Sequence, residues 1–317
     1  MKNSIKNLKI LITGGAGFIG SHLAEKLIEE KAKVFVVDDF SNGRKENLEA
    51  VKNEVKIIKE DISISFKEME KLLGKYRFDG IFHLACFPRS LSLKNPFRDL
   101  EVNVKGMLNI LEIAKLNKCK VVFTSNSGIY GNPQYLPIDE KHPDNPSTPY
   151  DANKLASEYY MKIYNRIFGV PIAICRLATV YGERQRTKPE WKPVIPEFAT
   201  KILNNEQSTI YWDGKQTRDL IYVKDVVQGL MKAFLAETRD EVFILGTGVE
   251  TSINDIYKII CKALGKWIEP KRVEKIAGDI KRMRYSSKKA EEWFKFKPDY
   301  NLEQGIKNYI NWFKVNK

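Results

Sequence analysis

Short apolar runs alternate with amphipathic segments through the first half of the chain. Runs rich in Ile, Val and Leu fit buried parallel strands, which helices cover on both faces. The expected strands lie at residues 9–12, 34–37, 55–58, 80–84, 121–124 and 172–176, and the expected helices at 21–30, 66–73, 99–116 and 150–168. This alternation predicts an α/β fold with a doubly wound parallel sheet.

The pattern loosens in the second half, where Pro189, Pro193 and Pro196 mark a loop. The elements expected after it are a helix at 195–203, strands at 209–211 and 242–245, and a helical tail from Ser252 that Pro270 and Pro298 interrupt. We therefore expect two interleaved parts without a clear linker. The larger part would be residues 1–177 and would also receive about 217–246, and the smaller part would be 178–216 and 247–317.

A glycine-rich loop, Thr13-Gly-Gly-Ala-Gly-Phe-Ile-Gly20, joins the first expected strand to the first expected helix. Glycines allow a tight turn and close backbone approach to a pyrophosphate, which the helix N-terminus attracts. The second strand ends at Asp38, where a carboxylate can bind the adenosine ribose hydroxyls and repel a 2′-phosphate. These features predict a Rossmann-type NAD site, unless Asp38 simply ends its strand.

Tyr150 and Lys154 are four residues apart in an expected helix, so they project from the same face. A nearby ammonium lowers the pKa of a phenol, and we expect Tyr150 to act as a general base for that reason. The strand at 121–124 is followed by Ser125 and Ser127, whose hydroxyls can hold a hydroxyl of a substrate. The pattern predicts proton transfer beside a nicotinamide.

Composition and charge limit which ligands and partners the protein is expected to bind. The net charge is +13, but the lysines are spread among glutamates along all 317 residues, so we expect no nucleic-acid ligand. No apolar run approaches the length of a membrane span and residues 1–9 do not form a signal peptide, so we expect a cytoplasmic protein without membrane contact. The four cysteines and three histidines show no metal-ligand spacing, so no metal is expected.

With these motifs in place, the chain resembles the extended short-chain dehydrogenase/reductases, specifically the NAD-dependent nucleotide-sugar epimerase/dehydratase family. The resemblance runs nearly end to end. Besides the glycine loop and the Tyr-x-x-x-Lys pair, it rests on Asp61-Ile62, His83-Leu-Ala-Cys86, Asn103-Val-Lys-Gly106, residues 176–182, Asp213-Gly-Lys-Gln-Thr-Arg-Asp219 and Tyr222-Val-Lys-Asp225.

The resemblance implies an NAD-binding domain, an interleaved nucleotide-sugar-binding domain and a role for each matching residue. The implied catalytic residues are Tyr150 and Lys154, with Ser125 or Ser127 as the proton-relay group. The implied cofactor residues are Gly14, Gly17, Phe18, Ile19, Gly20, Asp38, Asp61, Ile62, Leu84, Ala85, Asn103, Tyr150 and Lys154. The implied substrate residues are Ser92, Asn126, Thr179, Arg186, Tyr211, Arg218 and Asp279. Tyr211 would stack on the base or belong to a strand core.

The resemblance also implies a homodimer formed by the helices at 99–116 and 150–168. The apolar residues Ile110, Ile113 and Ala114 could serve that contact or face the sheet.

Departures from the family pattern bear on the reaction. The family often has Ser or Thr where this chain has Asn126, and its dehydratases carry an Asp-Glu pair where this chain has Ser127 and Gly128. The expected reaction is therefore 4-epimerisation of UDP-glucose and UDP-galactose or of the N-acetylated pair. At Thr179 and Arg186 the chain resembles the UDP-glucuronate 4-epimerases, and Arg186 could pair with a sugar carboxylate. Arg186 could instead hold its own loop in place. A net oxidoreductase and a non-catalytic NAD-binding protein are the competing interpretations.

Two further departures concern the substrate. The segment 86–90 is one residue shorter than in many epimerases, and Arg89 within it could reach an anion or lie at the surface. Lys275 takes the place of an arginine that the family usually has before Gly278-Asp279. A lysine neutralises phosphate but cannot hold it with two parallel hydrogen bonds.

Overall fold

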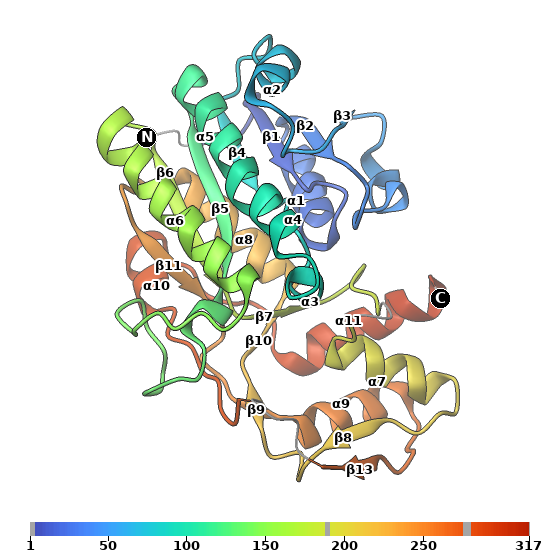
Figure 1. Cartoon of the computed structure of the whole chain (residues 1–317). Coiled ribbons are helices and arrows are strands. Elements are labelled where there is room, and N and C mark those ends of the chain that lie inside the picture. Colours follow the sequence, from blue (N-terminus) through green and yellow to red (C-terminus); the bar gives the residue numbers. More distant parts are fainter. Residues whose placement is uncertain (1–3, 188–190, 275–279, 317) are drawn as a thin grey trace.

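The computed structural model describes residues 4–187, 191–274 and 280–316, and a parallel sheet of seven strands lies at its centre (Figure 1). The strands are β1 (Lys9–Thr13), β2 (Lys33–Asp38), β3 (Val55–Lys59), β4 (Gly80–His83), β5 (Lys120–Asn126), β6 (Ile172–Leu177) and β11 (Val242–Leu245). Their order is β11-β6-β5-β4-β1-β2-β3, so it reverses between β1 and β4. In such sheets a ligand crevice opens beyond the carboxyl ends at this point. The predicted doubly wound parallel sheet is confirmed.

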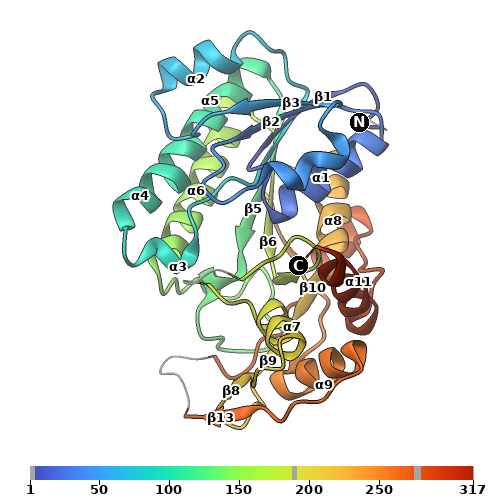
Figure 2. The ribbon, with the colours of Figure 1, turned by 90° about the vertical axis from the view of Figure 1, so that its right-hand side faces the viewer.

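Helices cover both faces of this sheet (Figures 1 and 2). One face packs against α1 (Phe18–Glu29), α8 (Val223–Leu235) and α10 (Lys288–Phe294), and the other against α2 (Phe66–Leu73), α5 (Gly106–Asn117) and α6 (Pro149–Phe168). On β1, Ile10 and Ile12 face the first layer and Leu11 faces the second, all fully buried. Successive strand residues point to opposite faces, which explains why β1 reads as an unbroken apolar run.

The helix expected over residues 99–116 consists of several segments. α4 (Pro96–Leu100) passes into a π-helical segment, η2 (Glu101–Lys105), and then into α5. Asn103 lies in the π-helical segment, where its Nδ2 donates to Asp99 and its Oδ1 accepts the N–H of Phe87 at 3.2 Å. Such bulges often occur near functional sites, and helical periodicity does not reveal them.

A third hydrophobic core holds the C-terminal part together. Phe198 of α7 (Val194–Leu203), Tyr257 of α9 (Ile253–Leu264) and Tyr309 of α11 (Leu302–Val315) are buried in it. Next to α9, β13 (Lys271–Val273) pairs with β8 (Thr209–Tyr211), as Figure 2 shows. The expectation of a wholly helical tail is therefore wrong, because β13 has the sequence Lys-Arg-Val and its single apolar residue, Val273, forms no apolar run.

The chain passes more than once between the sheet and the C-terminal core. β7 (Thr179–Tyr181) follows the sheet strand β6 and pairs with β10 (Leu220–Tyr222), after which α8 and β11 return to the sheet. The other short elements are α3 (Arg89–Ser92), η1 (Lys45–Val51), η3 (Ser127–Tyr130), β9 (Thr217–Arg218) and β12 (Thr251–Ser252). Among the described helices, none has the length and apolar character needed to cross a membrane.

Candidate active site

A cleft of about 450 Å³ opens at the carboxyl ends of the sheet strands. Its lining comes from the segments that follow β1, β2, β3, β4 and β5, and from α6. The predicted site residues that line it are Gly14, Gly17, Phe18, Ile19, Gly20, Asp38, Asp61, Ile62, Leu84, Ala85, Ser125, Asn126, Tyr150 and Lys154. The structure thus brings the glycine loop and the Tyr150–Lys154 pair, more than a hundred residues apart in the sequence, to one cleft.

The glycine loop has no room for larger residues. Gly14 has a positive φ of 70°, and a Cβ atom there would lie 2.7 Å from the backbone nitrogen of Ala85. A Cβ atom on Gly20 would lie 2.2 Å from the carbonyl oxygen of Gly14. Because α1 begins at Phe18, within this motif, the free N–H groups of its first turn are available for a phosphate. The loop therefore fits the pyrophosphate of a dinucleotide.

Asp38 supports this loop from the end of β2. Its Oδ2 accepts the N–H of Ala16 and its Oδ1 accepts the N–H of Phe40, both at 2.9 Å. Burial raises the pKa of this carboxyl, while the two backbone hydrogen bonds oppose the shift. Each carboxylate oxygen accepts more than one hydrogen bond, so Asp38 can brace the loop and still bind ribose hydroxyls. Sequence reasoning predicted only the second task.

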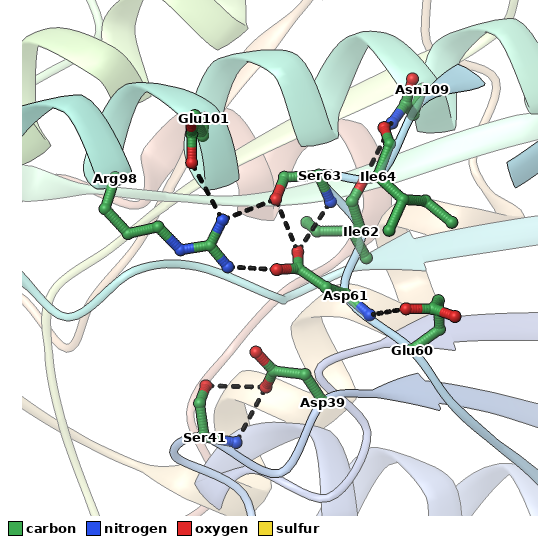
Figure 3. Close-up of polar contacts among 10 residues, drawn as sticks. All are labelled: Asp39, Ser41, Glu60, Asp61, Ile62, Ser63, Ile64, Arg98, Glu101 and Asn109. Atoms are coloured by element: carbon green, nitrogen blue, oxygen red, sulfur yellow. Dashed lines mark hydrogen bonds and ion pairs between the residues drawn. The ribbon is translucent and has the colours of Figure 1, made fainter. Parts of the chain in front are cut away.

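Asp61 lies in the same cleft, in a polar cluster shown in Figure 3. Its Oδ1 accepts hydrogen bonds from the backbone and hydroxyl of Ser63 at 2.8 and 2.7 Å, and its Oδ2 pairs with Arg98 of α4. Burial would raise the pKa of Asp61, but Ser63 and then Arg98 lower it overall. Arg98 also binds Glu101 and itself lines the cleft. Sequence reasoning missed Arg98, because no local pattern links it to a residue so far away in the chain.

The start of α6 fixes the position of Tyr150 and Lys154. The side chain of Thr148 caps the helix by accepting the N–H of Asp151, and Pro149 occupies its first turn. Lys154 is buried, donates to the carbonyl of Thr124 at 2.9 Å and lies 4.4 Å from the centre of the Phe123 ring. The hydroxyl of Tyr150 contacts the thiol of Cys86 at 3.9 Å.

The expectation that Lys154 lowers the pKa of Tyr150 is wrong for this structure. Burial raises the pKa of Tyr150 well above its usual value, and Cys86, Asp151 and Asp99 raise it further. The ammonium of Lys154 lies 5.6 Å from the centre of the phenol ring and is directed to Thr124. Tyr150 therefore needs another positive charge near its hydroxyl before it can serve as a base at neutral pH.

The end of β5 presents Ser125 and Asn126 to the cleft. Ser125 donates its hydroxyl hydrogen to Glu158 at 2.5 Å, and Asn126 donates to Asp151 at 2.8 Å. Ser127, in η3, is not among the described residues that line the cleft. The two serines that sequence reasoning left open are therefore in different environments, and Ser125 is the one that faces the cleft.

Arg89 binds Asp151 through two parallel hydrogen bonds of 3.0 and 2.9 Å. Arg89 therefore reaches an anion, the carboxylate of Asp151 in the same chain, while its side chain stays 51% exposed, and the pair anchors the start of α6. Ser92 is fully buried and donates to the carbonyl of Arg89, so it supports α3. Asn103 makes the hydrogen bonds with Phe87 and Asp99 that are described above. None of the three is among the described cleft-lining residues.

The other predicted substrate residues lie apart from the described cleft lining. Arg186 stacks on Trp312 at 5.4 Å and donates to the carbonyl of Asn316, which agrees with the interpretation that it holds its loop. Tyr211 is 42% exposed, so it is not a core residue. Arg218 donates to the carbonyls of Thr217 and Ile280 at 2.8 Å.

Thr179 is exposed on β7, and Asp279 and Lys275 lie outside the described residues. The glycine-loop residues and the Tyr150–Lys154 pair, predicted from local motifs, line the cleft, whereas the described residues predicted in the C-terminal part from family resemblance alone do not.

Comparison with known proteins agrees with this geometry. Residues 11–309 match the family model described as GDP-mannose 4,6 dehydratase. The chain belongs to the NAD-dependent nucleotide-sugar epimerase/dehydratase family. Within the family it is 34% identical to a UDP-glucose 4-epimerase of Mycolicibacterium smegmatis, over 97% of this chain and 99% of that protein.

Two solved structures of the epimerase/dehydratase family are similar over almost the whole chain. The UDP-glucose 4-epimerase of Thermotoga maritima with UDP-glucose has a TM-score of 0.92 and 33% identity, covering 98% of this chain and 99% of that one. The UDP-N-acetylglucosamine 4-epimerase of Methanobrevibacter ruminantium with UDP-N-acetylmuramic acid has a TM-score of 0.93 and 32% identity, covering 98% and 100%. A related UDP-glucose 4-epimerase has been solved with NAD.

Proposed function

We propose that this protein is an NAD-dependent nucleotide-sugar 4-epimerase that interconverts UDP-glucose and UDP-galactose or their N-acetylated counterparts. The observation that carries the proposal is that the glycine loop and the Tyr150–Lys154 pair line one cleft. The similar epimerases named above support the substrate class.

The residues around the glycine loop fit NAD. Gly14, Gly17 and Gly20 would hold its pyrophosphate, Asp38 its adenosine ribose, and Asp61 and Ile62 its adenine. Lys154 would hold the nicotinamide ribose. When bound, NAD would accept hydride from carbon four of the sugar and return it, and would bring a positive charge close to Tyr150. That charge is of the kind needed to offset the burial that raises the pKa of Tyr150.

The chain's own residues handle the proton. Tyr150 would take the proton of the substrate hydroxyl at carbon four as hydride leaves that carbon. It would give the proton back when hydride returns to the opposite face of the sugar. The two half-reactions balance, because the proton and the hydride both end on the atoms they left.

The surroundings of Gly128 favour epimerisation over dehydration, although the matching family model is named after a dehydratase. A Cβ atom on Gly128 would lie 2.4 Å from Oδ1 of Asp151 and 2.9 Å from Nδ2 of Asn126. The Asp151–Asn126 hydrogen bond therefore fills the space that an acidic side chain at residue 128 would need. A dehydratase requires an additional acid and base to eliminate water, and Ser127 and Gly128 supply neither.

Epimerisation of UDP-glucuronate loses its main support in this structure. The resemblance that suggested this reaction would place Arg186 near a sugar carboxylate, yet Arg186 packs on Trp312 and α11. A net oxidoreductase stays the principal competing activity, because it would use the same cofactor and the same tyrosine.

Proton NMR of the purified protein with NAD tests the proposal. Separate samples would contain UDP-glucose, UDP-N-acetylglucosamine and UDP-glucuronate. We expect the anomeric signal of a 4-epimer with the first or second sugar, and NAD should not be consumed. Stoichiometric change of the cofactor would instead indicate net redox chemistry, and no new sugar in any sample would refute the proposal.

We also infer that two copies of the chain associate through α4 and α6, which pack side by side. Phe97 of α4 and Ile167 of α6 are 80% and 68% exposed, and Leu93 between α3 and α4 is 71% exposed. The stripe formed by Ile110, Ile113 and Ala114 is buried against the sheet and does not serve this contact. Light scattering should give the mass of a dimer for the unmodified protein and of a monomer for Phe97→Asp with Ile167→Asp.

We further infer that the enzyme works in the cytoplasm. Cys86, Cys175 and Cys261 carry free thiols, which suits a reducing compartment. Fractionation of cells that produce the protein would test this, and enrichment in a secreted fraction would contradict it.

A further inference from the structure

A buried ionic network lies directly behind Ser125. The hydroxyl of Ser125 donates to Oε1 of Glu158 at 2.5 Å. Arg176 donates to the same carboxylate twice, from Nε to Oε1 at 2.9 Å and from Nη2 to Oε2 at 2.7 Å. Its Nη1 reaches Asp144 at 2.7 Å. Glu158 and Arg176 are 1% and 4% exposed, so the network is part of the protein interior.

The fold places this network at the proposed site of chemistry. Tyr150, Lys154 and Glu158 follow each other at intervals of four residues in α6, so they project from the same face of that helix. Ser125 and Arg176 are opposite each other in the register of β5 and β6. Glu158 therefore meets Ser125 and Arg176 where the helix crosses the ends of the two strands.

The chemistry of these groups fixes the direction of each hydrogen bond. Arg176 can only donate, so Glu158 accepts from it and its carboxylate is held by two parallel bonds. Ser125 has one hydrogen, and that hydrogen is directed to Glu158. The oxygen of Ser125 consequently keeps a lone pair for a donor in the cleft, which Ser125 lines.

We propose that Glu158, clamped by Arg176, is a positioning residue that presets Ser125 as a hydrogen-bond acceptor for a sugar hydroxyl at or next to carbon four. This inference rests on the proposed function. Ser125 then holds the substrate but does not relay its proton to Tyr150, because the hydrogen of Ser125 is directed to Glu158 and not to Tyr150. The proton passes directly between the substrate oxygen and the oxygen of Tyr150, and the amide of Asn126 cannot relay it either.

A double-mutant cycle tests this assignment. Its first arm is Ser125→Ala, and its second removes the buried pair together as Glu158→Leu with Arg176→Met, which leaves neither charge without its partner. Each arm should lower kcat by roughly 10- to 100-fold, because loss of substrate positioning alone reaches this size. The combined variant should be no slower than the slower arm, and the Kd for NAD should not change in any of them.

Two further variants separate positioning from folding. Arg176→Lys keeps a cation beside Glu158 but loses the two parallel bonds, so it should lower kcat less than deletion of the pair, and the loss should disappear in the Ser125→Ala background. Asp144→Asn removes only the charge of a contact of Arg176 that is 29% exposed and leaves both hydrogen bonds from Arg176 to Glu158 in place, so it should lower kcat less than Arg176→Lys does. If the pair-deleted protein does not fold, the cycle with Arg176→Lys decides the question.

Multiplicative losses in the combined variants would overturn the assignment, because they would show that Glu158 acts independently of Ser125. An equal loss of NAD affinity and kcat would overturn it as well, because it would indicate general damage. If the unmodified protein interconverts no nucleotide sugar, the proposed function has failed separately. The same cycle is then measured as the Kd of UDP-glucose for the NAD-loaded protein, where additive losses again contradict the role of Glu158.

Discussion

The two ends of the cleft differ in how far their polar groups are already paired. At the expected adenosine end, both oxygens of Asp38 and of Asp61 accept hydrogen bonds or an ion pair from the protein. At the expected sugar end, the hydroxyl of Tyr150 contacts a thiol at 3.9 Å, and Oδ1 of Asn126 has no partner among the described residues.

This difference affects how the cofactor and the sugar would bind at the two ends. A fully paired carboxylate keeps its position whether or not a cofactor is bound, which lowers the cost of ordering the site. A polar atom without a partner is unfavourable unless a ligand or water satisfies it. We therefore expect changes at the adenosine end to act on NAD affinity, and changes at the sugar end to act on turnover.

The largest effect should come from Tyr150→Phe at the sugar end. Loss of the hydroxyl removes the group that exchanges the proton, so kcat should fall on the order of 1,000-fold. The Kd for NAD, measured by fluorescence titration, should not change. A variant that keeps more than a tenth of the activity would show that Tyr150 is not the acid/base. A large loss of NAD affinity would contradict the expectation that the sugar end of the cleft acts on turnover and not on NAD binding.

Gly20→Ala should have the next largest effect, this time on the cofactor. Its new Cβ atom would lie 2.2 Å from the carbonyl oxygen of Gly14, so the loop must shift. Overpacking of this kind costs about 1–3 kcal/mol, which corresponds to a roughly 10- to 100-fold weaker Kd for NAD. Gly169→Ala is a control for backbone strain far from the loop: its φ of 67° disfavours alanine, but no atom lies within 4 Å of its added Cβ, so the Kd for NAD should not change. Unchanged NAD binding in Gly20→Ala would contradict the assignment of the loop.

Arg98→Ala should have a smaller effect at the same end. Removing the guanidinium leaves Asp61 without its cation in a site that Arg98 itself lines. The pair is about 30% exposed, so screening limits the effect, and we expect the Kd for NAD to rise about three- to tenfold. Glu101→Gln is the control, because Glu101 binds Arg98 but is 56% exposed. An Arg98→Ala enzyme with a changed kcat and an unchanged Kd for NAD would contradict the expectation that the adenosine end of the cleft acts on NAD affinity.

The remaining expected effect concerns the stability of the fold and not ligand binding. Burial, and to a smaller extent the charge of Arg184, lowers the pKa of His22 to about 3. Burial, and to a smaller extent the charge of Lys154, lowers the pKa of His83 to about 3. The unfolded chain binds these protons near pH 6.5 and the folded chain does not. The stabilisation is therefore complete above pH 6.5 and is lost as the pH falls toward 3, by about 2 kcal/mol per histidine at pH 5.

Urea unfolding at pH 7 and pH 5 measures this loss. The variant His22→Gln keeps a donor for the carbonyl of Glu183, which the ring now contacts at 3.1 Å, and should reduce the loss between pH 7 and pH 5 by about 2 kcal/mol. An equally steep dependence in the variant would show that His22 is not the group that titrates.

The fold could be predicted from the sequence to within a few residues at most element ends. Strands of this sheet are buried on both faces, so β1, β4 and β6 appear as apolar runs that need no further information. The π-helical segment could not be predicted because its five residues are too few to show a period, and β13 could not because its sequence Lys-Arg-Val holds only one apolar residue.

The sequence predicted those residues of the cleft that belong to one local motif. The glycine loop and the Tyr150–Lys154 spacing are such motifs, and both face the cleft. Arg98 and Glu158 were missed because their partners, Asp61 and Ser125, lie more than thirty residues away and only the fold brings them together. Burial of Tyr150 also reversed the pKa shift expected from Lys154, since spacing reveals a neighbouring charge but not the loss of solvent.

The most direct test of the account uses isotopes at carbon four. UDP-glucose is incubated in D₂O with the enzyme and NAD, and the product is analysed by NMR and mass spectrometry. If the hydride is removed and returned within one active site, UDP-galactose should carry protium at carbon four and no deuterium from solvent. Deuterium at carbon four would show that a proton, not a hydride, leaves this carbon, and would contradict the proposed mechanism.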